Sequence, residues 1–202
     1  MSNQQWLNLG VDEQIVSSLI KRGIKTPFPI QSLTIPDALR GNDVCGKAKT
    51  GSGKTLAFGI PMVQNLDQSS GNKNPRGLIM VPTRELATQV KEELDPLLNG
   101  KSMAAVAIYG GANIEEQIKA IKRGIDIIVA TPGRMIDLLE REEISLQSLQ
   151  MVVLDEADRM ADMGFLPQVE WILRRVDRNH QTLLFSATLD GVVNTLIQRY
   201  QS

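Results

Sequence analysis

The sequence predicts an α/β fold in which a parallel sheet carries helices on both faces, in a single domain. Short apolar runs alternate along the chain with longer segments of helical periodicity, a pattern typical of parallel strands joined by crossover helices. Runs such as Ile127–Ala130 are apolar at every position, as expected for strands buried on both faces. The 202 residues are 42% hydrophobic, which is enough for one sizeable core.

The strands and helices can be assigned in chain order. The candidate strands are the short apolar runs Val44–Cys45, Leu78–Val81, Ala104–Ile108, Ile127–Ala130, Val152–Leu154 and Thr182–Phe185. Helices should fill the gaps, and the first clear one is Asp12–Arg22, which Gly23 terminates. Similar periodicity marks Glu85–Leu98, Ile114–Lys122 and Val192–Tyr200. The polar segment 68–74 reads as a surface loop and not as a domain linker.

A glycine-rich motif, AKTGSGKT, follows the first candidate strand at Ala48–Thr55. Gly51 and Gly53 lack side chains, so backbone N–H groups can converge there on phosphate oxygens. Lys54 can supply a point charge to the β and γ phosphates, and Thr55 a hydroxyl to a metal ion. The general pattern has a glycine where this chain has Ala48. The motif predicts a site for a nucleoside triphosphate.

A second motif, VVLDEAD, occupies Val152–Asp158 and places two carboxylates directly after a buried strand. Asp155 is expected to hold Mg²⁺, directly or through water. Glu156 is expected to orient or deprotonate the attacking water. Two acids after a strand could also mark only the start of a helix, where negative charge is favoured. Beside a phosphate loop, the catalytic reading is the stronger one.

The composition limits the kinds of partner and cofactor. The net charge is −1, so any contact with nucleic acid must be local. The one cysteine, Cys45, excludes an internal disulfide and fits a reducing compartment, and its place in a candidate strand predicts a buried thiol. The one histidine, His180, is expected in a solvated loop, so metal ligation through histidine is not expected.

We also expect a soluble, cytoplasmic protein with no membrane partner. The sequence has no run of about 18 apolar residues, and its first residues lack the charged and apolar regions of a signal peptide.

Polar clusters follow nearly every candidate strand. Ligands of open parallel sheets bind beyond the carboxyl ends of the strands, so these clusters should line one cleft. They are the phosphate loop, Pro82–Ala87, Gly110–Gly111, Thr131–Arg134, Asp155–Asp158 and Ser186–Thr188.

Together these segments resemble the amino-terminal RecA-like domain of a DEAD-box RNA helicase, over essentially all of residues 1–202. The resemblance rests on Trp6, Gly23–Gln31, AKTGSGKT, PTRELA, Gly110–Gly111, TPGR, DEAD and SAT, in the family order. It implies a RecA-like sheet of the P-loop NTPase class, with an upstream aromatic and a Q-motif segment within residues 1–31. The chain departs from the family at Trp6, where phenylalanine is usual, and at Phe28, where threonine is frequent.

The resemblance implies an adenine nucleotide site. Gln31 can pair with the exocyclic amine and a ring nitrogen of adenine, and Trp6 can stack on the base. Without the resemblance, Gln31 would be read as a helix surface residue and Trp6 as a core anchor. The nucleotide-binding residues implied are Trp6, Lys25, Gln31, Thr50, Gly51, Ser52, Gly53, Lys54 and Thr55, with Lys54, Asp155 and Glu156 catalytic and Thr55 and Asp155 on Mg²⁺.

The resemblance also implies an RNA site that grips sugar and phosphate without reading bases. Its residues would be Pro82, Thr83, Arg84, Gly110, Gly111, Thr131, Pro132, Gly133 and Arg134. Ser186 and Thr188 would couple nucleotide state to RNA binding by hydrogen bonding to the DEAD loop, which ends at Asp158. Gln117, Asp162 and Gly164 also match the family pattern and are given scaffolding roles.

Three functions are compared. The leading one is the ATP-binding half of an ATP-dependent RNA helicase, in which ATP and RNA close two domains around one strand. In this family, a second RecA-like domain supplies arginines to the γ-phosphate, and that domain is absent from this chain. We therefore expect the chain to bind ATP or ADP but to hydrolyse ATP poorly. An ATP-gated RNA clamp without unwinding uses the same motifs and stays open. A small-molecule P-loop kinase would leave the DEAD, SAT and TPGR segments unexplained.

Overall fold

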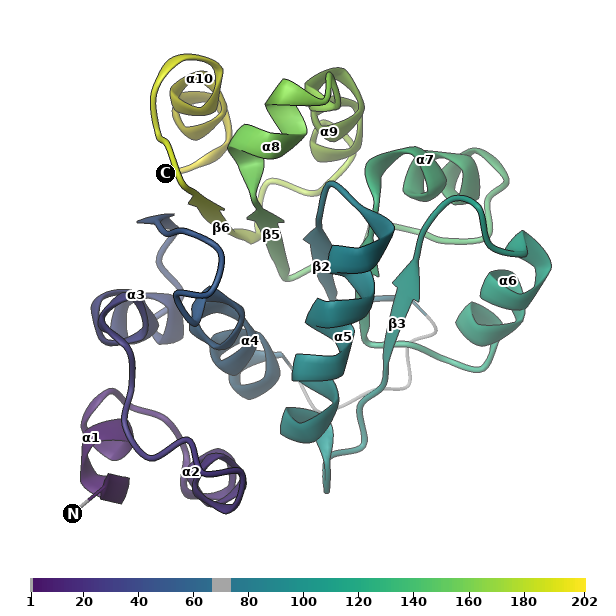
Figure 1. Ribbon diagram of the computed structural model, residues 1–202. Helices are drawn as coiled ribbons and strands as arrows, with labels where there is room; N and C mark the ends of the chain where they lie inside the picture. The colour runs from purple at the N-terminus through teal and green to yellow at the C-terminus, as the bar shows by residue number, and fades with distance from the viewer. Residues whose placement is uncertain (1, 67–73) are drawn as a thin grey trace.

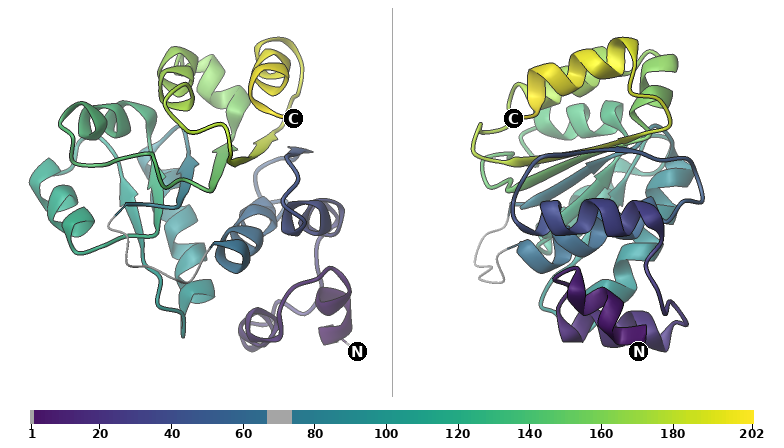
Figure 2. Two further views of the ribbon diagram at one scale, coloured as in Figure 1. Left: turned by 180° about the vertical axis from the view of Figure 1, so that it is seen from behind. Right: turned by 90° about the vertical axis from the view of Figure 1, so that its left-hand side faces the viewer.

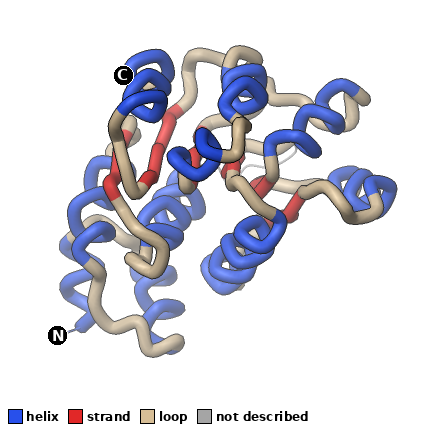
Figure 3. Tube along the Cα trace, turned by 45° about the horizontal axis from the view of Figure 1, so that its top comes forward, coloured by secondary structure: helices blue, strands red, loops and turns tan. Residues whose placement is uncertain are grey.

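The computed structural model describes residues 2–66 and 74–202. Of the predicted surface loop at 68–74, all but Asn74 lies outside the described residues. The described residues form one parallel sheet enclosed by two layers of helices (Figures 1 and 3).

The sheet contains six strands within the described residues, in the order β1-β6-β5-β2-β4-β3, and every neighbouring pair is parallel. Each predicted strand is present, and its ends differ from the prediction by at most two residues. The strands are β1 Val44–Lys47, β2 Gly77–Met80, β3 Ala105–Ile108, β4 Ile127–Ala130, β5 Met151–Asp155 and β6 Gln181–Ser186.

The predicted helices are present, and the gaps between strands hold further ones. In the described chain they are α1 Ser2–Asn8, α2 Glu13–Lys21, α3 Pro29–Leu39, α4 Lys54–Asn65, α5 Arg84–Leu98, α6 Ile114–Lys122, α7 Pro132–Glu140, α8 Ala157–Asp162, α9 Leu166–Leu173 and α10 Gly191–Tyr200. Helices α3, α4 and α5 cover one face of the sheet, and α6 to α10 cover the other (Figure 2). Helices α1 and α2 pack outside the first layer.

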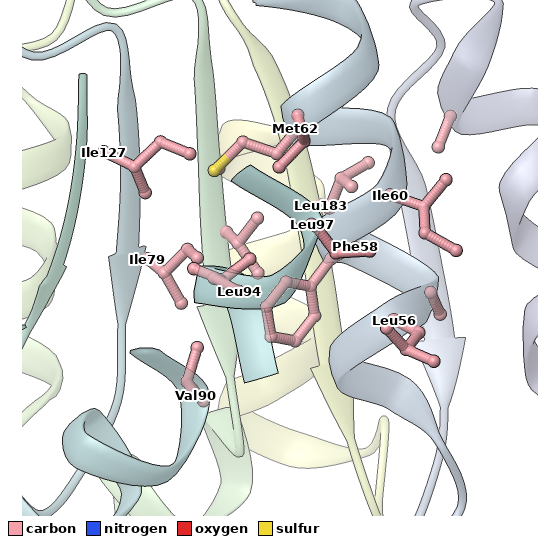
Figure 4. Close-up of a cluster of buried hydrophobic side chains, with 14 of the residues drawn as sticks. Leu56, Phe58, Ile60, Met62, Ile79, Val90, Leu94, Leu97, Ile127 and Leu183 are labelled. Atoms are coloured by element: carbon pink, nitrogen blue, oxygen red, sulfur yellow. The ribbon is translucent and has the colours of Figure 1, made fainter. Parts of the chain in front are cut away.

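Two hydrophobic cores follow from the alternation of side chains along each strand. Ile79 and Leu183 face α4 and α5, where they pack with Phe58 and Leu94 (Figure 4). The second layer of helices packs on strand side chains that point the other way, which include Leu78, Ile128, Val152 and Leu184. Because both faces are covered, the central strands are apolar at every position, as the sequence predicted.

One prediction about the sheet is wrong. Cys45 is exposed and not buried. Strand β1 lies at the edge of the sheet, and its side chains alternate between buried and exposed, so that Cys45 and Lys47 lie on its uncovered side. His180 lies in the predicted loop before β6. In the described part of the chain, the helices are too short or too polar to cross a membrane.

Candidate functional site

The glycine-rich loop connects β1 to the amino terminus of α4. Gly51 and Gly53 both have φ of +82°, a left-handed conformation that glycine adopts without the steric penalty of a side chain. Gly53 is the N-cap of α4, and Lys54 and Thr55 are its first two residues. The unpaired N–H groups and the positive end of the helix dipole therefore face the loop. This local geometry is that of an anion site.

The two sequence motifs meet at this loop. Asp155 ends β5, and Lys54 Nζ lies 3.0 Å from Asp155 Oδ1 and 3.4 Å from Glu156 Oε1. The Thr50 hydroxyl donates a 2.9 Å hydrogen bond to Glu156 Oε1, across 106 positions of sequence. Glu156 has φ of +54°, so its backbone is held in the left-handed region at the start of α8. Loop, lysine and carboxylates form one connected cluster.

The electrostatics of this cluster favour a bound cation. Burial raises the pKa of Asp155 to about 6, against the lowering effect of the Lys54 ammonium and with a smaller raising effect of the Glu156 carboxylate. Glu156 Oε2 is buried and accepts no hydrogen bond from the described residues, and its nearest cation is Arg159 Nη1 at 3.6 Å. Buried anionic oxygens that are short of partners fit a hard divalent cation, and the Thr55 hydroxyl adds an oxygen of the same kind.

Within the described residues, no three His, Cys, Asp or Glu side chains form a metal-binding group. Mg²⁺ does not need such a cage, because it is usually held by one or two carboxylates together with substrate phosphates. The residues present therefore fit Mg²⁺ bound with a nucleotide.

The loop and the carboxylates border a cavity of about 390 Å³. Helix α5 supplies its far wall through Leu86, Gln89, Val90 and Glu93, and of these sequence reasoning had placed only Leu86 at the cleft. These positions have the spacing i, i+3, i+4 and i+7, which places them on one face of a helix. The spacing could have grouped them, but only the packing of α5 beside α4 brings that face to the nucleotide loop.

Gln31 does not lie as predicted. Its side chain is 2% exposed, its Oε1 accepts a 2.7 Å hydrogen bond from the Phe28 N–H, and its Nε2 donates a 2.9 Å bond to the Gly53 carbonyl. Each polar atom of the amide thus makes one hydrogen bond within the protein, and Gln31 does not line the nucleotide cavity. Gln31 is also not a helix surface residue. It ties the start of α3 to the phosphate loop.

The prediction that Trp6 stacks on adenine is corrected. The indole is 0% exposed within the core beneath α1 and α2, so it offers no free ring face to a base. The alternative reading as a core anchor is the one that its burial supports. Lys25 is exposed, and the Ser52 hydroxyl donates to the Lys49 carbonyl at 2.6 Å. Neither Lys25 nor Ser52 lines the cavity.

The segments predicted to bind RNA converge on a second cavity, of about 470 Å³, at the same edge of the sheet. Pro82, Arg84, Gly110 and Thr131–Arg134 line it. The N-cap of α5 is Thr83, whose hydroxyl accepts a 3.3 Å hydrogen bond from the Leu86 N–H. Helix α7 begins at Pro132, so two helix amino termini lie beside this cavity.

Side-chain contacts hold these segments together. The Arg84 guanidinium lies over the Tyr109 ring, 4.9 Å from its centroid. Gln117 donates from Nε2 to the Tyr109 carbonyl at 3.0 Å and accepts from Arg134 Nη1 at 3.1 Å. This agrees with the scaffolding role given to Gln117. Sequence reasoning missed four further residues that line the cavity, Tyr109, Asp137, Phe165 and Gln168, because no motif marks them.

The predicted link between the DEAD and SAT segments is present. The Ser186 hydroxyl accepts a 3.1 Å hydrogen bond from the Asp158 N–H, and Ser186 is completely buried. Thr188 is exposed. The end of β6 is thereby fixed to the first turn of α8, directly after the two carboxylates.

Comparison with protein families decides the assignment, since the DEAD/DEAH box helicase family model matches residues 28–196. The chain belongs to the DEAD/DEAH box helicase family. Among its relatives, it is 46% identical over 191 residues to the ATP-dependent RNA helicase CshA of Listeria monocytogenes. It is 48% identical over 202 residues to the pre-mRNA-processing ATP-dependent RNA helicase prp5 of Botryotinia fuckeliana.

Solved DEAD-box structures have the same fold as this helicase-family chain. The DEAD box protein of Methanococcus jannaschii matches with a TM-score of 0.91 at 36% identity, over 98% of this chain and 54% of that one. The yeast splicing factor Prp28 matches with a TM-score of 0.89, over 97% of this chain and 48% of that one. The predicted RecA-like sheet is therefore confirmed.

The chain spans only part of these helicases. It aligns over 95% of its own length with the Listeria helicase but over 36% of that protein, and over 97% of its own length with prp5 but over 17% of that protein.

Proposed function

We propose that this chain is the nucleotide-binding domain of an ATP-dependent RNA helicase. The observation that carries the proposal is the meeting of Lys54, Thr50, Asp155 and Glu156 at the left-handed glycine loop. This arrangement has the parts that phosphoryl transfer needs: backbone donors, a cation and two carboxylates. Family membership and the names of the relatives support the same conclusion.

Each residue of the cluster has a distinct role in the proposal. The loop N–H groups and Lys54 bind the β and γ phosphates. Thr55 and Asp155 hold Mg²⁺, which when bound neutralises charge on the phosphates. Glu156 accepts the proton of the attacking water or orients it, and the Thr50 hydroxyl fixes the position of this carboxylate.

RNA binds in the 470 Å³ cavity through its backbone. The helix amino termini at Thr83 and Pro132 supply N–H groups to phosphates, while Arg84 and Arg134 supply charge. Contacts of this kind do not read bases, so binding is independent of sequence. Coupling of nucleotide state to RNA binding runs through the DEAD and SAT segments, which the hydrogen bond between Ser186 and Asp158 joins.

In the whole protein, a second RecA-like domain supplies arginines that stabilise the transition state, and closure of the two domains on ATP and RNA separates short duplexes in the cytoplasm. The proposal is motivated by the fraction of each relative that this chain spans. An ATP-gated clamp would share these steps up to strand separation.

The test compares two variants of the full-length protein. Lys54→Ala should weaken ATP binding by about 10-fold to 100-fold, because a charge-assisted contact to the phosphates is lost. Glu156→Gln should bind ATP and RNA as the wild type does but neither hydrolyse ATP nor separate strands. Lys47→Ala, which removes an exposed positive charge beside the loop, is the control and should change neither property.

Equal loss of ATP binding in Lys54→Ala and Glu156→Gln would contradict the separate roles. ATP-dependent retention of RNA by the wild type, without strand separation, would identify a clamp.

A further inference from the structure

Phe28 lies in the Gly23–Gln31 segment, at a position where threonine is frequent in the family, so the segment does not account for its aromatic ring. Its side chain is 54% exposed, although it borders the nucleotide cavity. Single exposed apolar side chains are ordinary on protein surfaces, so exposure alone assigns nothing. What distinguishes Phe28 is the surface that its ring contacts.

The ring lies directly against the phosphate loop. A Cβ placed on Gly53 would meet Phe28 Cδ2 at 2.5 Å, so the ring occupies the space that a side chain at Gly53 would need. Phe28 is also the N-cap of α3, with φ of −75° and ψ of 160°, and its N–H is held by Gln31. The backbone that carries the ring is thus fixed to the loop by the chain of hydrogen bonds from Phe28 through Gln31 to Gly53.

In the described residues, the other aromatic side chains do not reach this cavity. Trp6 is in the core, and Phe58 and Phe185 pack on each other with ring centroids 5.7 Å apart. Tyr109 and Phe165 line the second cavity. A nucleotide whose phosphates lie on the loop therefore has one aromatic ring within the walls of its cavity.

We propose that Phe28 is the platform on which the base of the bound nucleotide stacks, in place of Trp6. The inference rests on the proposed nucleotide site. An exposed ring against the loop can cover one face of a base, because aromatic rings and bases stack through their π-faces whichever base is present. Gln31 then acts by holding the platform and the loop together through the two hydrogen bonds of its amide.

The experiment uses the full-length protein and the variants Phe28→Thr, Phe28→Trp and Leu33→Thr. Threonine removes the ring but is a favoured N-cap, so α3 should not lose stability. Tryptophan keeps an aromatic face. Leu33 is a matched control, since it is 74% exposed on the same helix and does not line the nucleotide cavity. Binding of Mg·ADP and of Mg·tripolyphosphate, which has no base, is measured by calorimetry or competition.

We expect Phe28→Thr to weaken ADP binding about tenfold, which corresponds to about 1.4 kcal/mol of stacking, and to leave tripolyphosphate binding unchanged. Phe28→Trp should bind ADP at least as tightly as the wild type. Leu33→Thr should bind both compounds with wild-type affinity.

Unchanged ADP affinity in Phe28→Thr, with normal binding by the wild type, would overturn the stacking role alone. Equal weakening of tripolyphosphate would also overturn it, because the ring would then act on the loop and not on the base. A wild type that binds neither compound would remove the proposed nucleotide site as well.

Discussion

Two residues of the nucleotide loop share a backbone conformation but differ in surroundings. Gly51 and Gly53 have the same φ of +82°, yet an added Cβ meets nothing within 4 Å at Gly51 and two side chains at Gly53. One of these is the amide of Gln31, 2.6 Å away, which is buried and hydrogen bonded to the Gly53 carbonyl. Sequence reasoning assigned both glycines one role, and the structure separates them.

Substituting the two glycines separates the effect of left-handed backbone strain on stability from the effect of side-chain crowding. Gly51→Ala should lower the free energy of unfolding by about 1 kcal/mol, from left-handed strain alone. Gly53→Ala should lower it by about 1–3 kcal/mol more, because the Phe28 ring and the Gln31 amide must move as well. Urea denaturation of both variants checks the difference. Equal losses would mean that the Gln31 contact adjusts freely.

At the scale of elements, helix α2 has the clearest capping contact that the sequence could predict. Asp12 precedes the helix, and its Oδ1 accepts a 2.9 Å hydrogen bond from the Ile15 N–H. Helix α3 was harder to predict, since Pro29 and Pro36 lie within it and proline usually interrupts helices. It is held by tertiary contacts with α4 and β1, which no local pattern reports.

The cap on α2 gives a stability prediction. Asp12→Ala should lower the free energy of unfolding by about 1 kcal/mol, because one helix N–H loses its acceptor. Asp12→Asn keeps an acceptor oxygen and should lower it by less. The urea midpoints of the two variants check this. An equal loss in both would indicate that the charge of Asp12, which lies 4.0 Å from Lys101 Nζ, matters more than the cap.

In the molecule as a whole, the six described strands run parallel, so every loop that follows a strand lies at the carboxyl end of the sheet. Both cavities lie at this end of the sheet, and the Ser186–Asp158 hydrogen bond joins the end of β6 to α8 directly after the two carboxylates. In the described residues, Lys54 lies at both carboxylates, and Arg159 Nη1 lies 3.6 Å from Glu156 Oε2. Under the proposed function, the arginines that stabilise the transition state are supplied by a second RecA-like domain.

A protein of residues 1–202 alone should therefore turn over ATP very slowly, with or without single-stranded RNA. An arginine of this kind contributes about 10³ to 10⁵ in rate. Steady-state hydrolysis, with circular dichroism as the control for folding, checks the prediction. RNA-stimulated turnover by this chain would show that it obtains an arginine in another way, for example by self-association.

The amino-acid sequence alone predicts the α/β class, the strands, the phosphate loop and the two carboxylates. These follow from local chemistry, since an apolar run, a glycine or a carboxylate after a strand has the same meaning wherever the strand is placed. The resemblance added the segments that line the second cavity.

The side chains that are available to a ligand follow from the packing of the whole chain and not from local sequence. Trp6 is buried by the packing of α1 and α2, Gln31 is occupied by Phe28 and Gly53, and Cys45 is exposed because β1 is an edge strand. Tertiary packing also brings one face of α5 and the Phe28 ring to the nucleotide cavity. Burial and hydrogen-bond partners depend on segments far apart in the chain, and a residue's own neighbours in sequence do not specify them.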